Sequence, residues 1–190
     1  MLLLVGLGNP GSDYTNTRHN IGFKIIDAIN LHFKLSKQKP KFKGLLTTGN
    51  IEEKKIYAIK PLTFMNNSGT AIKELIDYFK IDAKDVIVFH DDMDIDFGKI
   101  KAKFGGSSAG HNGIESIDKF IGKEYSRVRI GIGHPKQNKK VNNHVLEDFK
   151  EDEEEKIKEI TENIVKQIPT LIDKKMDLFS SKVNQNLNGI

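Results

Sequence analysis

The chain has 190 residues, of which 37% are hydrophobic, and a formal charge of +4 at pH 7, so we expect a single domain over residues 1–190 with its own core. It contains no cysteine, which excludes disulfides, thiol nucleophiles and Cys-ligated metals and is typical of a cytoplasmic protein. The first residues lack the pattern of a signal peptide, and no stretch approaches the ~20 apolar residues of a membrane span, so we expect no membrane partner.

The first predicted element is a buried strand that leads into a polar loop. Residues 2–7 form an unbroken apolar run bounded by turn residues, which is typical of a strand buried on both faces. The residues that follow are mostly polar until Ile21, and they include Asn9, Tyr14, Arg18, His19 and Asn20. Open α/β sheets bind their ligands at the carboxyl ends of such strands. We therefore interpret this loop as half of an active site, with His19 as its base.

The next part of the chain alternates predicted helices and strands. The patterns first predict a helix over residues 21–33, with Asn20 as its N-cap, and then a lysine-rich connector over 35–43. Two strands follow, over 45–48 and 56–59, joined as a hairpin around Gly49 and Asn50. A polar loop over 60–69 then leads into an amphipathic helix over 71–80. Strands alternating with helices indicate an α/β fold.

The second half continues this alternation and ends in helices. The patterns predict a buried strand over residues 86–89 and a strand over 99–104 with lysines on one face, followed by a glycine-serine loop over 105–113. A helix over 114–121 and a strand over 127–132 with both arginines outward come next, and then a mobile basic loop over 136–143. The chain ends in a helical segment over 152–179 that breaks or kinks at Pro169, and in a frayed tail over 183–190.

Polar side chains follow four of the predicted strands. They are Asn9 and His19 after the first strand, Asn66 after the hairpin, Asp91 after the central strand and Asn112 after the lysine strand. If these loops share one edge of a sheet, His19 can act as a general base, because its ordinary pKa of ~6.5 leaves it mostly neutral at pH 7. Asp91 can orient its ring, and the two later asparagines can donate to a carbonyl or its oxyanion. With no nucleophile beside the base, the pattern predicts attack of an activated water on an ester-like bond.

The same residues carry a resemblance to a known family. The segment Leu7-Gly-Asn-Pro-Gly-x-x-Tyr-x-x-Thr-Arg-His-Asn-x-Gly22 resembles the N-terminal signature of bacterial peptidyl-tRNA hydrolases. Later blocks match that family in the same order, at residues 60–69, 90–94, 110–113 and 129–135. The resemblance covers about residues 2–150, and the helical tail is similar only in length and pattern.

The resemblance implies an enzyme that cleaves the ester between a peptide and the terminal ribose of its tRNA. It assigns proton acceptance to His19, stabilisation of the basic form of His19 to Asp91, and discrimination of N-blocked from free aminoacyl-tRNA to Asn9. Further positions on the site or on the tRNA contact are Tyr14, Phe64, Met65 as a wall of the site, Asn66, Asn112 and Arg129. Lys101 and Lys103 would bind the 5′ phosphate of the tRNA, in agreement with the wet cationic face that the strand pattern predicts.

The resemblance also implies a single α/β domain with a twisted mixed sheet between helices and a C-terminal helical segment, a monomer that uses no metal or other cofactor. The sequence departs from the family pattern at two positions. Ala109 stands where glycine is common, which concerns the loop before His111, and His144 replaces a usual aromatic.

Several motifs have other interpretations. Residues 6–11 satisfy the dinucleotide fingerprint GxGxxG, although the helix is predicted to start about ten residues late. Residues 106–110 satisfy GxSxG with Ser108 as nucleophile, although the preceding strand is half-exposed. The acidic run 90–94 is able to bind a divalent cation, and His111 fits either a turn or a site role. The lysines are by default a solvated surface, and a non-catalytic RNA-binding module is the rival to the enzyme.

Overall fold

The fold is built on one mixed β-sheet, described for residues 1–135 and 141–188 in a computed structural model. Its strands are β1 (Leu2–Gly6), β2 (Lys39–Lys41), β3 (Gly44–Ile51), β4 (Lys54–Pro61), β5 (Val86–Asp92), β6 (Ile100–Phe104) and β7 (Ser126–Gly131). Within the described residues the strand order is β2-β3-β4-β1-β5-β7-β6. The pairs β1–β4, β1–β5 and β5–β7 are parallel, whereas β2–β3, β3–β4 and β6–β7 are antiparallel. The predicted α/β class with a mixed sheet is therefore confirmed.

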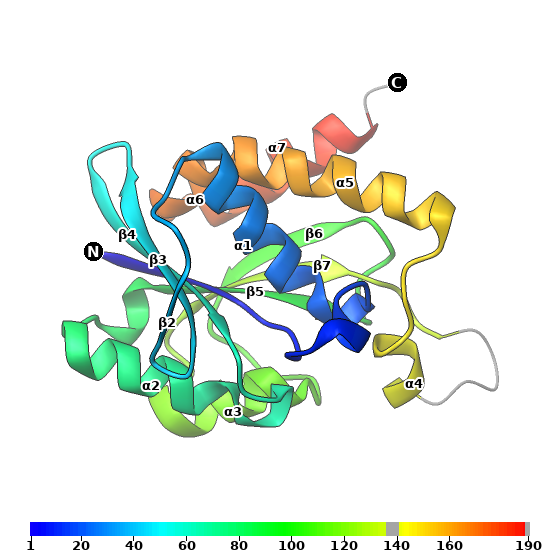
Figure 1. The fold of residues 1–190 in the computed structure, drawn as a ribbon. Coiled ribbons are helices and arrows are strands. Elements are labelled where there is room, and N and C mark those ends of the chain that lie inside the picture. Colours follow the sequence, from blue (N-terminus) through cyan, green and yellow to red (C-terminus); the bar gives the residue numbers. More distant parts are fainter. Residues whose placement is uncertain (136–140, 189–190) are drawn as a thin grey trace.

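Helices cover both faces of this sheet (Figure 1). One face carries α1 (Ile21–His32), α5 (Glu151–Lys166), α6 (Ile168–Ile172) and α7 (Met176–Asn188), and the other carries α2 (Ser68–Phe79) and α3 (Asn112–Ile121). The short helix α4 (Val141–Val145) lies beyond the end of the sheet. A hydrophobic core lies between the sheet and the helices on each face. Strand β1 is buried at every residue and contributes to both cores, with Leu2 and Leu4 in the core under α1 and α5 and Leu3 and Val5 in the core under α2 and α3. None of the described helices is long and apolar enough to cross a bilayer.

The parallel strands bring their carboxyl ends to one edge of the sheet. Helix α1 packs against this edge through Gly22, where an added Cβ would lie 2.3 Å from the backbone nitrogen of Leu7 and 2.5 Å from the carbonyl oxygen of Phe89. Only glycine permits so close an approach of helix to strand. As a result the turn before α1, which carries His19, lies directly beside the end of β5.

The hairpin around Gly49 and Asn50 was placed wrongly in the sequence prediction. The observed register runs from Gly44 opposite Pro61 to Ile51 opposite Lys54, so the turn consists of Glu52 and Glu53. Glu52 adopts a φ of +53°, a region in which glycine or asparagine is the usual residue. The lysine-rich connector before the hairpin also differs, because it contains the short edge strand β2. Lysine and proline are typical of exposed edge strands.

The two arginines of β7 do not both point to solvent. Arg127 is only 2% exposed, because the loop after β6 folds over it and accepts its hydrogen bonds at the carbonyl oxygens of Gly105 and Ser107. Arg129 is half-buried. The pattern had placed Arg127 outward because alternation indicates the two faces of a strand but not what covers each face.

The C-terminal tail is an ordered helix up to residue 188, which corrects the frayed tail predicted for residues 183–190. The helical segment breaks before Pro169, as its ring requires, and α7 then packs on the sheet with Val183 fully buried. Ser180 and Asn184 of α7 bind the edge strand β6: Ser180 Oγ accepts from Ala102 N at 2.8 Å, and the Asn184 amide pairs with the N–H and C=O of Ile100 at 3.0 and 2.8 Å. Residues 189–190 lie outside the described residues.

Asn184→Ala should lower the free energy of unfolding by about 1–2 kcal/mol, because two backbone groups of β6 would be left without their partners. Urea denaturation followed by circular dichroism measures the change. Asn186→Ala on the exposed side of the same helix is the matched control and should have little effect. Equal stability of both variants would mean that α7 is held by its apolar contacts alone.

The basic loop expected over residues 136–143 overlaps helix α4. Residues 136–140 lie outside the described residues, and residues 141–143 form the first part of the helix. His144, one of the departures from the family pattern, is 8% exposed, and its Nε2 lies 3.0 Å from the carbonyl oxygen of Gly133. It therefore ties α4 to the segment that follows β7.

Candidate active site

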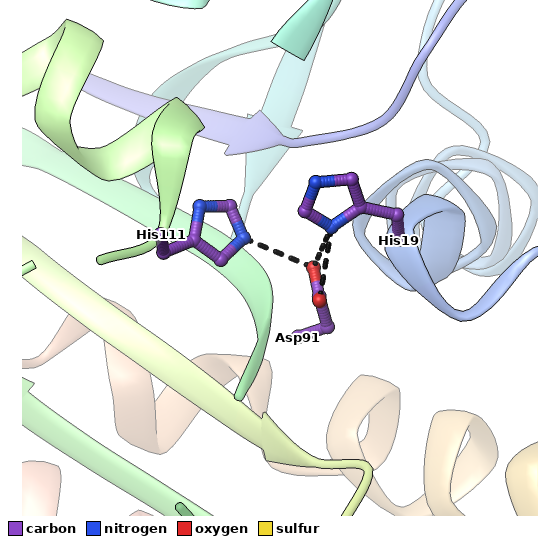
Figure 2. A group of neighbouring side chains, drawn as sticks. All are labelled: His19, Asp91 and His111. Atoms are coloured by element: carbon purple, nitrogen blue, oxygen red, sulfur yellow. Dashed lines mark hydrogen bonds and ion pairs between the residues drawn. The ribbon is translucent and has the colours of Figure 1, made fainter. Parts of the chain in front are cut away.

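Three side chains from separate elements meet at the carboxyl edge of the sheet (Figure 2). His19 lies in the short 3₁₀ turn Arg18–Asn20 before α1, Asp91 is the second-last residue of β5, and His111 is the N-cap of α3. His19 Nδ1 is 2.8 and 2.9 Å from the two carboxylate oxygens of Asp91, and His111 Nε2 is 3.0 Å from Asp91 Oδ1. The expected strand ended at Phe89, but β5 continues to Asp92 and so carries the carboxylate itself.

The hydrogen bonds of this cluster fix the proton on each ring. His111 Nδ1 accepts from the backbone N–H groups of Gly113 and Ile114 at 3.1 and 3.3 Å, so its proton sits on Nε2 and is donated to Asp91. The carboxylate of Asp91 accepts a second hydrogen bond from His19 Nδ1. His19 Nε2 therefore keeps its lone pair, and in Figure 2 this atom points away from Asp91. A base with one ring nitrogen held and the other free can activate water.

Charge and burial act in opposite directions on this pair. Burial alone would lower the pKa of His19, but the charge and hydrogen bond of Asp91 outweigh it and hold that pKa above the ordinary 6.5. Burial alone would raise the pKa of Asp91, but His19 and His111 hold it well below its usual range, so Asp91 stays ionised. Burial and the neighbouring His111 keep the pKa of His90 well below 6.5, so this fully buried ring is neutral.

Asn9 is held in one orientation by its neighbours. The sequence predicted Asn20 as the N-cap of α1. Asn20 does occupy that position, but its side chain makes no capping hydrogen bond to the helix. Instead, its amide accepts from Asn9 N and donates to Asn9 O, each at 2.9 Å. Asn9 Oδ1 accepts from Met65 N at 2.8 Å, which leaves Nδ2 as the end available for a ligand.

His19 and Asn9 open into a cavity of about 400 Å³. Its remaining lining residues come from the loop after β4, the start of α3, the last residue of α4 and the residue after it: Phe64, Met65, Asn66, Asn112, Val145 and Leu146. Tyr14 does not line this cavity, but its ring meets that of Phe64 edge-on at 6.5 Å between centroids. A smaller cavity of about 60 Å³ is lined by His19, Asp91 and Val145, among others. The structure thus brings together Asn9, His19, Asn66, Asp91 and Asn112.

Asn112 reaches this edge by a route that the sequence did not indicate. Strand β6 is antiparallel, so its end lies beside Ser126 at the opposite edge, and residues 105–111 return the chain to the site. Ala109 in that loop has a φ of +49°, in the left-handed region that favours glycine. The loop thus adopts this backbone conformation with an alanine.

A cluster of cations lies on one face of β6 and β7. Lys101 is directly opposite Arg129, and Lys103 is opposite Arg127. Burial and the two arginines lower the pKa of Lys103, and Arg129 Nε donates to Asp92 Oδ2 at 2.7 Å. Asp92 is the neighbour of Asp91, so the cluster adjoins the site without lining its larger cavity. Both arginines already have partners, Arg127 in the loop carbonyls and Arg129 in Asp92, so the two lysines carry the charge of this face that these contacts do not engage.

The alternative motifs lack the structure that their chemistry needs. Helix α1 begins ten residues after Gly11, so its N-terminus cannot serve the GxGxxG loop as a dinucleotide site requires. Ser108 follows an antiparallel half-exposed strand, and its hydroxyl donates to Glu115 at 3.3 Å. A nucleophile elbow instead follows a buried parallel strand.

The acidic run 90–94 does not converge on one point. Asp92 pairs with Arg129, Asp94 pairs with His134, and Asp91 faces the two histidines. Among the described residues, His19, Asp91 and His111 are the one group whose ligand atoms could hold a metal ion. Their N–O separations of 2.8 to 3.0 Å are those of hydrogen bonds, whereas tetrahedral Zn²⁺ ligands lie about 3.3 Å apart.

The sequence left some site residues unassigned. His111 had two open roles, and it now proves to be both the cap of α3 and a partner of Asp91. Val145 and Leu146 were missed, because an apolar residue at the end of a short helix carries no signal for a cavity wall.

Comparisons with known proteins agree on one family. The family model described as peptidyl-tRNA hydrolase matches residues 3–189, so the match includes the C-terminal helices. The chain is 73% identical over 184 residues to the peptidyl-tRNA hydrolase of Pelagibacter ubique (strain HTCC1062), covering 97% of this chain and 99% of the relative. It is 46% identical over 181 residues to that of Ehrlichia ruminantium (strain Welgevonden), covering 95% and 93%. The crystal structure of peptidyl-tRNA hydrolase from Acinetobacter baumannii is similar with a TM-score of 0.90 and 34% identity, covering 97% of this chain and 94% of that one. The chain belongs to the peptidyl-tRNA hydrolase family.

Proposed function

We propose that this protein hydrolyses the ester that joins a peptide, or an N-acylated amino acid, to the 3′ ribose of tRNA. The observation that carries the proposal is the pair formed by His19 and Asp91, in which one ring nitrogen is held and the other is free beside a cavity of about 400 Å³. An activated water is the simplest nucleophile for such a base, and family membership supplies the substrate class.

The reaction follows from the orientation of these groups. His19 Nε2 takes a proton from water while the resulting hydroxide attacks the ester carbonyl. Nδ2 of Asn9 and the amides of Asn66 and Asn112 would donate hydrogen bonds to the substrate and to the developing oxyanion. When the tetrahedral intermediate collapses, its bond to the ribose oxygen breaks and His19 returns the proton to that oxygen. Asp91 stabilises the imidazolium that exists between the two transfers.

The cationic face of β6 and β7 supports a contact with the tRNA acceptor end. Lys101, Lys103 and Arg129 lie together next to the site, and backbone phosphates attract such a cluster without reading sequence. We assign the 5′ phosphate of the tRNA to Lys101 and Lys103. Phe64 lines the cavity, is 60% exposed and offers its ring to the substrate together with Tyr14. We also propose that the protein is a single-domain monomer that acts in the cytoplasm.

The double variant Lys101→Ala/Lys103→Ala should raise KM for peptidyl-tRNA and leave kcat close to wild type. The slope of log KM against log salt should fall by about 1 for each phosphate that the variant no longer binds. Steady-state kinetics at several salt concentrations measure both effects. Lys158→Ala/Lys166→Ala removes two exposed lysines of α5 and is the matched control. An equal effect in both variants would mean that net charge alone matters, and that the tRNA binds elsewhere.

The direct test is release of N-acetylated amino acid from N-acetyl-aminoacyl-tRNA, with and without EDTA. We expect multiple turnovers in both arms. Loss of activity with EDTA would make His19, Asp91 and His111 a metal site instead of a base and its partners. Binding of the tRNA ester without turnover would support the rival function, a non-catalytic RNA-binding module.

A further inference from the structure

The loop that carries His19 is paired with the segment between α4 and α5. Arg18 N donates to Glu147 O at 3.0 Å, and Phe149 N donates to Asn16 O at 3.4 Å. Between these bonds, Thr17 and Asp148 form an antiparallel bridge. The backbone on the N-terminal side of His19 is thus joined to a segment that lies far later in the chain.

The side chain of Arg18 reinforces this pairing from the inside. It is 3% exposed, its Nη2 donates to Glu153 Oε2 at 2.7 Å, and its guanidinium carbon lies 4.9 Å from the centroid of the Phe149 ring. Glu153 stands in the first turn of α5, and the same oxygen accepts from Lys150 N at 2.8 Å. One carboxylate oxygen therefore caps α5 and binds Arg18.

Stability alone does not explain the ion pair between Arg18 and Glu153. Arg18 Nε and Nη1 are buried with no hydrogen-bond partner among the described residues. Removing a guanidinium from water is costly, and a buried ion pair often stabilises a fold no more than apolar side chains of the same volume would. A neighbouring ion pair between α1 and α5, Lys24 with Glu154, is more exposed and carries no such cost.

The paired segment leads directly into the wall of the site. Glu147 follows Leu146 and Val145, of which Val145 lines both cavities beside His19 and Leu146 lines the larger one. Arg18 is in turn the residue before His19. We propose that Arg18, held by Glu153 and Phe149, is a positioning residue that sets the separation between His19 and the wall formed by Val145 and Leu146.

This inference rests on the proposed function, since it concerns the fit of the same cavity to its substrate. Arg18 binds Glu153 through the planar fork of its guanidinium and stacks the face of the same group on Phe149. Lysine has neither feature and cannot replace it. A misplacement of about 1 Å in a reacting group can cost ~100-fold in rate. Arg18→Lys, which keeps the charge, should therefore lower kcat/KM for N-acetyl-aminoacyl-tRNA at least ~10-fold.

The test compares Arg18→Lys, Glu153→Gln and their combination with the control Lys24→Met. We expect the two single variants to lose similar activity, the double variant to lose no more than either, and Lys24→Met to stay within ~2-fold of wild type, because exposed ion pairs contribute little. The pH at which activity is half-maximal should not move, because the hydrogen bonds of His19 with Asp91 remain. Wild-type kcat/KM in Arg18→Lys, additive losses in the double variant, or a shifted pH profile would each overturn the proposal.

Hydrogen exchange supplies a readout that does not depend on activity. Glu153→Gln should raise exchange at the amides of residues 145–149 and leave β5 as protected as in wild type, because Glu153 is partly exposed and its replacement should not unfold the core. Unchanged exchange at residues 145–149 would overturn the positioning role. A wild-type protein that fails to release the N-acetylated amino acid would instead refute the proposed function, whatever the exchange result.

Discussion

His19→Ala should lower kcat for N-acetyl-aminoacyl-tRNA by at least ~100-fold, which is the usual cost of losing a general base. Its Nε2 carries the lone pair that the hydrogen bonds of Asp91 and His111 leave available for a proton from water. Binding should survive, because the cationic face of β6 and β7 is untouched. Quenched-flow or steady-state release of the N-acetylated amino acid measures kcat, and tRNA titration measures affinity.

His32→Ala is the matched control for this variant. His32 is an exposed histidine in the last turn of α1, on the same helix that His19 precedes, so its removal tests for a general effect of losing an imidazole. We expect wild-type turnover. Full activity in His19→Ala would refute the mechanism, and loss of both turnover and affinity would indicate a folding defect, which a thermal melt identifies.

The elements that form the site were predictable where pattern and chemistry coincide. The apolar run from Leu2 to Leu7 is typical of a strand buried on both faces, and a polar loop after such a strand points to a ligand. The positions of Asn9, His19 and Asp91 followed from the strands that precede them. Their convergence depended on the sheet being parallel at its centre, and the pairings of β1 with β4 and β5 provide this.

The errors arose where long-range packing decides the conformation. Gly49 lies inside β3, opposite Ile56, and an added Cβ there would lie 2.6 Å from the side chain of Leu35. The glycine therefore makes room for a distant side chain and does not mark a turn, and no local pattern indicates this. Val183 belongs to a buried helix face because α7 covers β6, although the surrounding residues are mostly polar. Arg127 is buried because a loop folds over it. The roles of His111, Val145 and Leu146 likewise depend on which segments meet in space.

Asp91→Asn should be nearly as damaging as loss of the base, with a drop in kcat of at least ~100-fold, because the amide would force the wrong tautomer on His19. His111 cannot change its role easily, since its Nδ1 accepts from two backbone N–H groups and its Nε2 must donate. His111 Nε2 would therefore donate its hydrogen bond to the amide oxygen of the new side chain. The amide N–H₂ would then face His19 Nδ1, which would have to accept, and the proton would move to Nε2, the atom that must receive one from water.

The pH profile separates this explanation from a general loss of fit. Activity needs neutral His19, so in wild type it should rise with pH through a midpoint above 6.5, where Asp91 places the pKa. Without the carboxylate, only burial acts on the ring, and burial lowers its pKa, so the midpoint of the residual activity in Asp91→Asn should move to lower pH. Asp96→Asn, which removes an exposed charge four residues after β5, should change neither kcat nor the midpoint. An unchanged midpoint in Asp91→Asn would show that the titrating group is not His19. A fall in both kcat and the midpoint would instead require that the Asp91 carboxylate sets both the position of the proton on the His19 ring and the basicity of that ring.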